Sequence, residues 1–493
     1  MNYLIALVSG ALLPLSLAPF GLWPFGLLAI AGWFWVLAHP GGRDWLHGWL
    51  FGVGKYAAGA SWVYVSINVY GHAPPLLAGF LVVLFVAGLG LFTLVNAVAF
   101  ARLRTGDVLA DAVIFAVVFV AFEWSLTWVL TGFPWLFAGH AHLATPLRGL
   151  APVGGVLLVS LAVALTATLT VAAVQLWRRA RRPAAALAVV VAALPWLAGW
   201  GLTGVAWVAP GATAEAALVQ GNVDQSVKWD PEESARIIRT YLELSEPHWD
   251  AGLLVWPEAA ITRFEHEVPE LLHQLDERGT AAGTAVVLGL PHAEREPDGA
   301  IVYHNAVRAV GTGEGRYLKR RLVPFGEYVP LERWLRGLIA FFDLPMSGFS
   351  PGPADQPLLG IGGRYAVMAI CYEVVYPDLV RAQAAAADVL MTVSNDTWFG
   401  ASTGPLQHLE MAQMRALENG RWMLRATNNG VTAIIDERGR IRDRLPQFEA
   451  GVLRGTWRTM TGTTPYTRYG YLPLLACAVV LLIFAFLVRR PGR

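Results

Sequence analysis

Long apolar stretches alternate with short polar connections over the first two hundred residues. A helix needs about 20 predominantly apolar residues to cross a bilayer. Stretches of roughly that length occur at residues 3–19, 22–38, 49–70, 76–100, 109–130, 150–176, 184–204 and 471–488. The pattern predicts eight membrane spans, seven of them within residues 1–208.

The long segment between the seventh and eighth stretches has a different pattern. Short runs rich in Val, Ile and Leu occur at residues 215–220, 252–256, 285–290, 301–310, 365–370, 388–393, 422–427 and 431–436. Helical periodicity separates several of them, at residues 232–247, 266–283, 376–387 and 405–420. This alternation predicts a layered α/β domain. No glycine-rich phosphate-binding loop opens a predicted helix, so the segment shows no sign of nucleotide binding.

Composition supports a membrane protein. Of 493 residues, 55% are hydrophobic and only 15% are charged, whereas about a quarter of the residues in a soluble protein are charged. The formal net charge of +1 leaves no basic excess for binding nucleic acid. Two cysteines, Cys371 and Cys477, exclude a disulfide-rich scaffold and a multi-cysteine metal site.

The basic residues predict how the spans are oriented. Arg and Lys near span ends stay on the cytoplasmic side of a membrane. With eight spans, the basic clusters at residues 102–104, 178–182 and 489–493 all fall on the side of the N-terminus. The α/β segment is then predicted to lie outside the cytoplasm. The first span lacks a basic leader and is followed at once by another, so we interpret it as retained rather than cleaved.

Lys319 and Cys371 stand out chemically within the α/β segment. Lys319 is one of only three lysines in the chain, and burial shifts the pKa of Lys more readily than that of Arg. The alternative for Lys319 is a solvated basic turn. Cys371 follows a predicted strand, where a turning backbone exposes a nucleophile. The alternative is a buried structural thiol, which is our interpretation of Cys477 in the last apolar stretch.

Glu258 also follows a predicted strand, and its neighbours Trp256 and Pro257 are expected to desolvate it. Desolvation would raise the pKa of the carboxyl into the range of a general base; a place beside a helix N-terminus is the alternative. A carboxylate, a thiol and an amine at strand ends form a coherent set for acyl transfer. The first removes the thiol proton, the thiolate attacks a carbonyl, and the ammonium stabilises the oxyanion.

The motifs around these residues resemble the nitrilase superfamily, which carries a Glu, Lys, Cys triad on an α-β-β-α sandwich. The whole chain is similar to the membrane-embedded apolipoprotein N-acyltransferase family within it. The motifs lie at residues 132–136, 220–222, 228–229, 256–258, 303–305, 322–330, 371–373, 394–396, 398–400 and 425–430. The Glu and Cys motifs occur across the superfamily, whereas their combination with eight spans and residues 324–328 is narrower.

The resemblance implies roles for individual residues. Glu258 would be the base, Lys319 the oxyanion stabiliser and Cys371 the nucleophile. Glu327 would hold Lys319 charged, and Glu373 would stand beside the thiol. The further site positions implied are Trp229, Asn305 and Tyr372. No cofactor and no metal site are implied.

The resemblance also implies an activity and a location. The enzyme would transfer an acyl chain from a phospholipid, typically phosphatidylethanolamine, to the N-terminal α-amino group of a diacylglyceryl-cysteine apolipoprotein. This is the last step of bacterial lipoprotein maturation, and it would proceed by ping-pong kinetics through a cysteine thioester. The chain would be a multi-pass protein of the cell (inner) membrane, and we expect a monomer. Residues 1–208 would form the membrane domain, 209–470 a periplasmic catalytic domain, and 471–493 the eighth helix with a cytoplasmic tail, so that both termini are cytoplasmic.

Two other functions remain open on the sequence. A membrane-tethered amidase of the nitrilase type would share the triad but hydrolyse its acyl-enzyme. A transporter with an extracytoplasmic binding domain would leave the triad unexplained.

Three features have no assigned role. Glu123, inside the fifth predicted span, is either functional or a bridge between helices. His140 and His142 depart from the family pattern, and their spacing allows a metal ligand pair or an ordinary loop. The aromatic residues of a Gly- and Pro-containing segment form either a mobile lid or a buried connection; they are Trp334, Phe341, Phe342 and Phe349.

Overall fold

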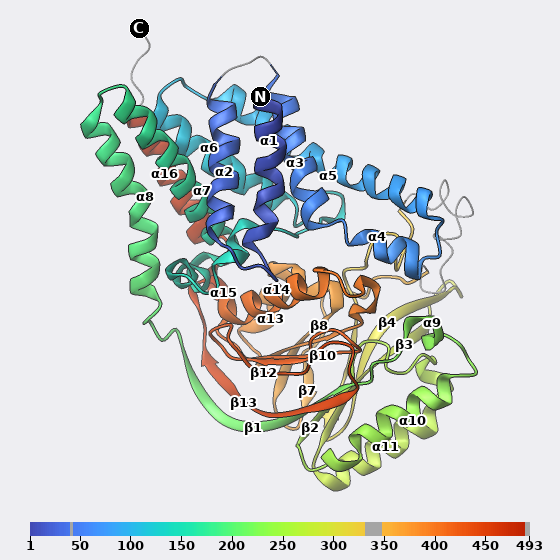
Figure 1. The fold of residues 1–493 in the computed structure, drawn as a ribbon. Coiled ribbons are helices and arrows are strands. Elements are labelled where there is room, and N and C mark those ends of the chain that lie inside the picture. Colours follow the sequence, from blue (N-terminus) through green and yellow to red (C-terminus); the bar gives the residue numbers. More distant parts are fainter. Residues whose placement is uncertain (40–42, 331–347, 489–493) are drawn as a thin grey trace. The chain divides into compact units, whose positions relative to one another are not determined.

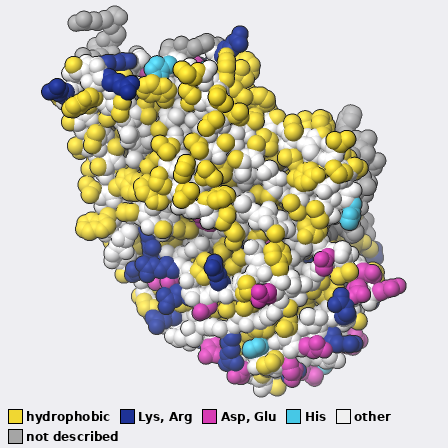
Figure 2. Space-filling view, viewed as in Figure 1, with side chains coloured by type: hydrophobic (Ala, Val, Ile, Leu, Met, Phe, Trp, Pro, Cys, Tyr) yellow, Lys and Arg dark blue, Asp and Glu magenta, His cyan; other side chains and the backbone are white. Residues whose placement is uncertain are grey.

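The computed structural model describes residues 1–39, 43–330 and 348–488, which form two compact units (Figure 1). Unit 1 comprises Met1–Tyr64, Leu76–Trp207 and Thr464–Arg493, and unit 2 comprises Val65–Pro75 and Val208–Thr463. On the face drawn in Figure 2, hydrophobic side chains crowd the surface of unit 1, while acidic side chains gather over unit 2. The two units therefore present surfaces suited to different surroundings.

Unit 1 is helical. Its longer described helices are α1 (Asn2–Leu12), α2 (Pro24–Ala38), α3 (Asp44–Gly59), α5 (Pro75–Leu103), α6 (Val108–Ser125), α7 (Ala151–Arg178), α8 (Arg182–Leu202) and α16 (Leu472–Val488). The backbones of α1 and α3 nearly touch: a Cβ on Gly10 would lie 1.9 Å from the carbonyl oxygen of Phe51. Small residues at such crossings let helix backbones approach closely. This is typical of membrane helices, which have no hydrophobic driving force for association.

Four described helices are long and apolar enough to cross a membrane, namely Pro75–Leu103, Val108–Ser125, Pro146–Arg178 and Arg182–Leu202. Three further predicted spans correspond to shorter apolar helices, Asn2–Ser16, Pro24–Ala38 and Leu472–Leu487. A helical membrane region is thus supported, and the count of eight spans stays a prediction.

The third predicted span, at residues 49–70, is wrong in its extent. Helix α3 ends at Gly59, where the Trp62 indole N–H donates to the Gly59 carbonyl at 3.1 Å. The following segment, Val65–Pro75, belongs to unit 2. There the Ser66 hydroxyl donates to the carbonyl of Trp398 at 2.7 Å. Hydropathy alone could not reveal this, because the segment is apolar enough to continue the span.

Unit 2 contains two sheets. The first has the order β13-β1-β2-β3-β4-β6, and the second β12-β11-β10-β9-β8-β7-β5. The strands are β1 (Val208–Gln220), β2 (Leu253–Val255), β3 (Ala285–Arg295), β4 (Ile301–Gly311), β5 (Gly313–Glu314), β6 (Arg316–Leu318), β7 (Leu359–Ile361), β8 (Tyr365–Ile370), β9 (Val389–Ser394), β10 (Met423–Thr427), β11 (Ala433–Ile435), β12 (Ile441–Arg444) and β13 (Gly451–Gly462).

The sheets pack face to face, with a helical layer on each outer face. Val255 and Val287 of the first sheet share a buried core with Met368 and Met391 of the second. Helices α10 (Ser234–Ser245) and α11 (Pro269–Ala282) cover the first sheet through a second core. Helices α13 (Pro377–Ala384) and α14 (Gly404–Asn419) pack on the second. The predicted layered α/β domain is confirmed as an α-β-β-α sandwich.

Parallel pairing places the chemically interesting segments. Strands β1, β2 and β3 run parallel in one sheet, and β8, β9 and β10 run parallel in the other. Parallel strands have their carboxyl ends at one edge, which is where binding residues collect in α/β folds. The residues that follow β2, β8 and β9 therefore lie at such edges.

Strand β13 is not foreseen by the hydrophobic pattern. It pairs antiparallel with β1 along the whole of that strand, but its sequence mixes glycine, arginine and threonine with few apolar residues. One face of it is exposed, so no continuous apolar run was needed.

Candidate active site

Glu258 and Lys319 form a buried ion pair. Glu258 follows β2 and Lys319 follows β6. The Lys319 ammonium (Nζ) lies 3.0 Å from Glu258 Oε1, and the two residues are 0% and 4% exposed. The interpretation of Lys319 as a solvated basic turn is therefore wrong.

A second carboxylate, that of Glu327, completes this arrangement. Lys319 Nζ lies 2.8 Å from Glu327 Oε1. Asn305 Nδ2 donates to both carboxylates, at 2.7 Å to Glu258 and 2.9 Å to Glu327. The backbone N–H of Asn395 donates to Glu258 Oε2 at 2.8 Å. We call Glu258, Lys319, Glu327 and Asn305 the acid–base cluster.

The cluster sets the charge of its members. Burial alone would raise the pKa of Glu258, but the Lys319 charge and the hydrogen bonds from Asn305 and Asn395 outweigh it, so the pKa lies below its usual value. The expectation of a raised pKa is thus wrong, because chain neighbours do not reveal these partners. Burial would likewise lower the pKa of Lys319, yet Glu258 and Glu327 hold it above its usual value. Both groups of the ion pair are charged at rest.

Cys371 stands at a strained turn directly after β8. Its φ angle is +52°, a left-handed conformation that costs energy in any residue other than glycine. The residue is 9% exposed, and burial, with the neighbouring Glu258 charge, raises the pKa of its thiol despite the opposing effect of Lys319. The resting group is a thiol within electrostatic reach of both members of the ion pair.

The Glu373 carboxylate is bound mainly by backbone N–H groups. One carboxylate oxygen accepts from the Tyr317 hydroxyl at 3.0 Å and from the N–H groups of Arg320 and Arg321 at 2.7 and 3.1 Å. The other accepts from the N–H of Ile370 at 2.8 Å. Burial raises the pKa of Glu373 to about 7. Its side chain ties the turn before Cys371 to the segment after Lys319.

A second buried cluster contacts the main-chain carbonyl of Cys371, and the sequence did not single it out. His408, on α14, places Nε2 3.1 Å from the Cys371 carbonyl oxygen, and a carbonyl only accepts, so Nε2 carries the proton. Asp396 Oδ1 lies 3.0 Å from His408 Nδ1, and Arg425 Nη2 donates to Asp396 Oδ2 at 2.6 Å. All three residues are at most 1% exposed. We call Asp396, His408 and Arg425 the backbone clamp.

The protonation states of the clamp residues follow from their neighbours. Burial would raise the pKa of Asp396, but the charge of Arg425 and the hydrogen bond from the Ser394 hydroxyl hold it well below its usual range. Burial and the Arg425 charge lower the pKa of His408, so its ring is neutral. The only sequence signal was that Asp396 and Arg425 fall inside the family motifs.

Lys228, at the end of the short helix α9 (Gln225–Lys228), is a second buried lysine beside the acid–base cluster. It is 1% exposed, and Nζ donates to the main-chain carbonyl of Glu258 at 3.2 Å. Its neighbour Trp229 has a buried indole N–H without a hydrogen-bond partner in the described part of the chain. The scarcity of lysine was a signal for Lys228, but only Lys319 was singled out on it.

The remaining predicted position near the thiol is Tyr372. It is buried, and its ring meets that of Tyr376 edge to face at 5.3 Å between centroids. Of the proposed lid, Trp334, Phe341 and Phe342 lie outside the described residues. Phe349 is described, and its backbone N–H donates to the Glu327 carbonyl at 3.0 Å.

In unit 1, the structure gives Glu123 a structural contact. This buried residue accepts the N–H of Ala138 at 2.9 Å on Oε1, so it anchors the 3₁₀ turn Ala138–His142. In the same turn, His142 Nδ1 lies 3.0 Å from the Thr145 hydroxyl. Among the described residues no group of three His, Cys, Asp or Glu side chains is arranged to hold a metal.

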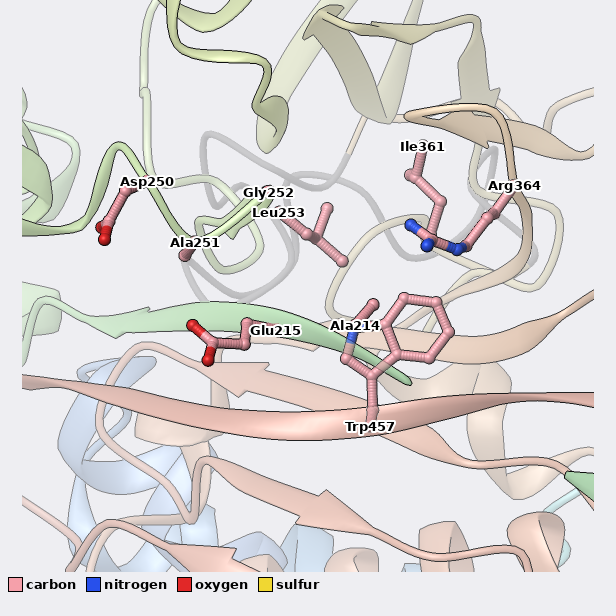
Figure 3. A pocket seen from close by; sticks show the side chains of 9 residues that line it. All are labelled: Ala214, Glu215, Asp250, Ala251, Gly252, Leu253, Ile361, Arg364 and Trp457. Atoms are coloured by element: carbon pink, nitrogen blue, oxygen red, sulfur yellow. The ribbon is translucent and has the colours of Figure 1, made fainter. Parts of the chain in front are cut away.

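Unit 2 also has a pocket of ≈ 270 Å³ that involves none of these residues (Figure 3). Arg364 lies at one end of it beside Trp457, and Glu215 and Asp250 lie at the other. Arg454 pairs with both of these carboxylates at 2.7 Å. Arg454 thus compensates one of the two negative charges at the acidic end, and the pocket lining includes no residue of the acid–base cluster.

Comparison with known proteins places both halves of the chain. Residues 215–465 match the carbon-nitrogen hydrolase family, and residues 9–169 match the apolipoprotein N-acyltransferase N-terminal domain. The chain is 48% identical to an apolipoprotein N-acyltransferase of Pseudomonas aeruginosa, over 99% of this chain and 96% of that protein. It is 50% identical to that of Azotobacter vinelandii, over the same shares. A solved CN-hydrolase superfamily protein from Xanthomonas campestris is 18% identical, with a TM-score of 0.38 over 50% of this chain and 91% of its own.

Proposed function

Because this chain belongs to the apolipoprotein N-acyltransferase family along nearly its whole length, we propose that Cys371 carries the acyl group between two membrane-bound substrates. The donor is a phospholipid, with phosphatidylethanolamine as the expected species. The acceptor is the N-terminal α-amino group of a diacylglyceryl-cysteine apolipoprotein. The observation that carries the proposal is the buried pairing of Lys319 with both Glu258 and Glu327 within electrostatic reach of Cys371.

The first half-reaction makes the thioester. Glu258 accepts the proton of the Cys371 thiol, and the thiolate attacks the ester carbonyl carbon of the donor. The carbonyl electrons move onto oxygen, and Lys319 stabilises that charge. When the intermediate collapses, the carbon–oxygen bond breaks and Glu258 returns its proton to the departing lysophospholipid oxygen. The acyl group is left on Cys371 Sγ.

The second half-reaction transfers the acyl group. The neutral α-amine of the acceptor attacks the thioester carbonyl carbon, and Glu258 takes a proton from the nitrogen. Collapse breaks the carbon–sulfur bond, an amide forms, and the proton on Glu258 returns to the Cys371 thiolate. Because the donor product leaves before the acceptor reacts, the kinetics are ping-pong.

The other polar residues support this cycle. Glu327 keeps Lys319 charged while Glu258 is protonated, since Lys319 then still has one carboxylate partner at 2.8 Å. Asn305 orients both carboxylates. Glu373 and the backbone clamp hold the turn that presents Cys371. Trp229 and Tyr372 are proposed to line the site.

Substrate affinity is proposed to come mainly from the lipid chains. Burial of an acyl chain is worth about 0.8 kcal/mol per CH₂, so the charged groups are left to govern the chemistry. We further propose eight spans with seven in residues 1–208, a periplasmic domain at 209–470, and a last span and cytoplasmic tail at 471–493, in a monomer of the inner membrane. The positions of the Arg clusters at 102–104, 178–182 and 489–493 support this orientation.

The test is to look for the acyl-enzyme and its fate. The purified protein is exposed to phosphatidylethanolamine, and its intact mass is measured before and after a diacylglyceryl peptide is added. We expect one acyl adduct, which the peptide removes as N-acylated product. Cys371→Ala should form no adduct, whereas the matched variant Cys477→Ala should behave as the parent. Release of free fatty acid without acylated peptide would point instead to an amidase that hydrolyses its intermediate.

A further inference from the structure

The buried charges around Glu258 do not balance within the acid–base cluster. Glu258 and Glu327 carry two negative charges, and Lys319 between them carries one positive charge. Buried charge without compensation is costly. The nearby Asp396 adds no further net negative charge, because Arg425 neutralises it. Without another cation, the cluster would oppose any further negative charge beside it.

Lys228 supplies the missing positive charge. Its Nζ donates to the Glu258 main-chain carbonyl at 3.2 Å, and no described carboxylate lies within ion-pair distance of it. An ammonium has three N–H donors, so two remain for other acceptors. The ammonium lies close enough to Glu258 and to Cys371 to interact electrostatically with both.

The segment that carries Lys228 is held firmly. Asp224 caps helix α9 by accepting the N–H of Ser226 at 2.8 Å. Gln225 accepts from Asn395 Nδ2 at 2.8 Å, and the N–H of Asn395 in turn contacts Glu258. The position of the Lys228 ammonium relative to Glu258 is thus fixed by several contacts and not by one long side chain alone.

The two lysines are held differently. Lys319 has a carboxylate on each of two donors, so it stays charged and locked in place throughout a cycle. Lys228 has only a neutral carbonyl as its described partner. Burial therefore lowers the pKa of Lys228 to about 8, although Glu258 and Cys371 oppose the shift. Lys228 thus keeps two donors without a described acceptor, against one on Lys319, and it lies within electrostatic reach of Cys371.

We propose that Lys228 is a second cation of the active site, which stabilises the negative charge on Cys371 sulfur whenever the thiolate forms. The inference rests on the proposed function, because it assigns a residue to the same thioester chemistry. When Glu258 takes the thiol proton, one negative charge moves from the carboxylate to sulfur, and no proton passes through Lys228. With Lys228 charged, the total charge of the buried site is zero before and after this step.

The test reads the thiolate directly, without lipid. In a Cys477→Ala background, Cys371 is the only thiol, and its rate of alkylation by iodoacetamide at one pH reports the thiolate fraction. Loss of a neighbouring positive charge raises the thiol pKa, and each unit lowers the thiolate fraction about tenfold. The rates of Lys228→Met and Lys228→Gln should therefore fall at least about tenfold below that of the parent. The rate of Lys228→Arg should stay within about threefold of the parent.

Two comparisons separate charge from structure. Gln can still donate to the Glu258 carbonyl, so a purely structural lysine predicts normal reactivity for Lys228→Gln and a defect for Lys228→Met alone. Arg236→Met removes an exposed charge whose side chain is 62% accessible and should change nothing. Thermal unfolding in detergent identifies the folded variants, and the decision rests on Lys228→Gln compared with Lys228→Arg.

The outcomes distinguish the inference from the function. If Lys228→Gln reacts as fast as the parent, or Lys228→Arg as slowly as Lys228→Gln, the inference is overturned while acyl-enzyme formation by the parent still stands. If the parent forms no acyl adduct, the proposed function fails even where the alkylation rates follow the expected order.

Discussion

Two buried charged clusters interact with Cys371, and they differ in whether their side chains can exchange a proton. The acid–base cluster pairs Lys319 with two carboxylates, and it lies within electrostatic reach of the Cys371 thiol. The backbone clamp pairs Arg425 with Asp396 and contacts Cys371 only at its carbonyl, through His408. Both are shielded from water, so burial does not separate them.

The difference lies in which group can exchange a proton. Arg stays charged under all ordinary conditions, whereas Lys and carboxylates exchange protons when their surroundings favour it. In the clamp, Asp396 is bound by Arg425 and its pKa is held well below the usual range, so it stays ionised. In the acid–base cluster, Glu327 can satisfy Lys319 alone while Glu258 is protonated. We propose that the backbone clamp holds a strained turn and that the acid–base cluster provides a carboxylate able to accept a proton.

The largest expected effect separates the clusters by activity. Glu258→Gln keeps the size of the side chain but removes the proton acceptor, so acyl-enzyme formation should slow by about 10²–10⁴-fold. Lys319 keeps Glu327 as partner, so the thermal unfolding midpoint should change little. The rate is measured by intact mass in a single turnover. Glu215→Gln, an exposed carboxylate at the pocket of Figure 3, is the control and should react as the parent.

The next effect separates the clusters by stability. Asp396→Asn leaves the Arg425 charge buried without a carboxylate, and breaking a buried pair in this way costs about 3–5 kcal/mol. The unfolding midpoint in detergent should drop clearly. Asp250→Asn breaks an exposed pair with Arg454 and should lower it far less. Equal midpoints for the two variants would show that the clamp does not hold the fold.

The smallest effect concerns the resting thiol. Because burial and the Glu258 charge raise the pKa of Cys371, the protonated form dominates at neutral pH. Alkylation of Cys371 in a Cys477→Ala background should rise about tenfold per pH unit through pH 9 without levelling off. A small thiol of ordinary pKa, near 8.5, levels off in the same buffers. A plateau for Cys371 near pH 7 would mean that a thiolate is already present at rest.

Much of the candidate site could be predicted because its residues stand directly after strands. Glu258 and Cys371 were proposed from that position, and Lys319 from its rarity as a lysine. The roles of Glu373 and Lys228 could not be read in this way. Glu373 lies two residues from Cys371, yet its carboxylate binds the N–H groups of Arg320 and Arg321. Lys228 contacts a carbonyl thirty residues away in the chain.

The sequence by itself determined the apolar helical half, the layered α/β half and the family, since burial of apolar surface and strand or helix periodicity are written locally along the chain. Only the tertiary structure decided the charges of the site and the place of Val65–Pro75. A pKa depends on which groups surround a side chain in space, and here Asn305, Asn395 and Lys319 reverse the shift that the neighbours of Glu258 in the chain predict. Likewise, an apolar segment reveals that it must be buried but not which core will bury it.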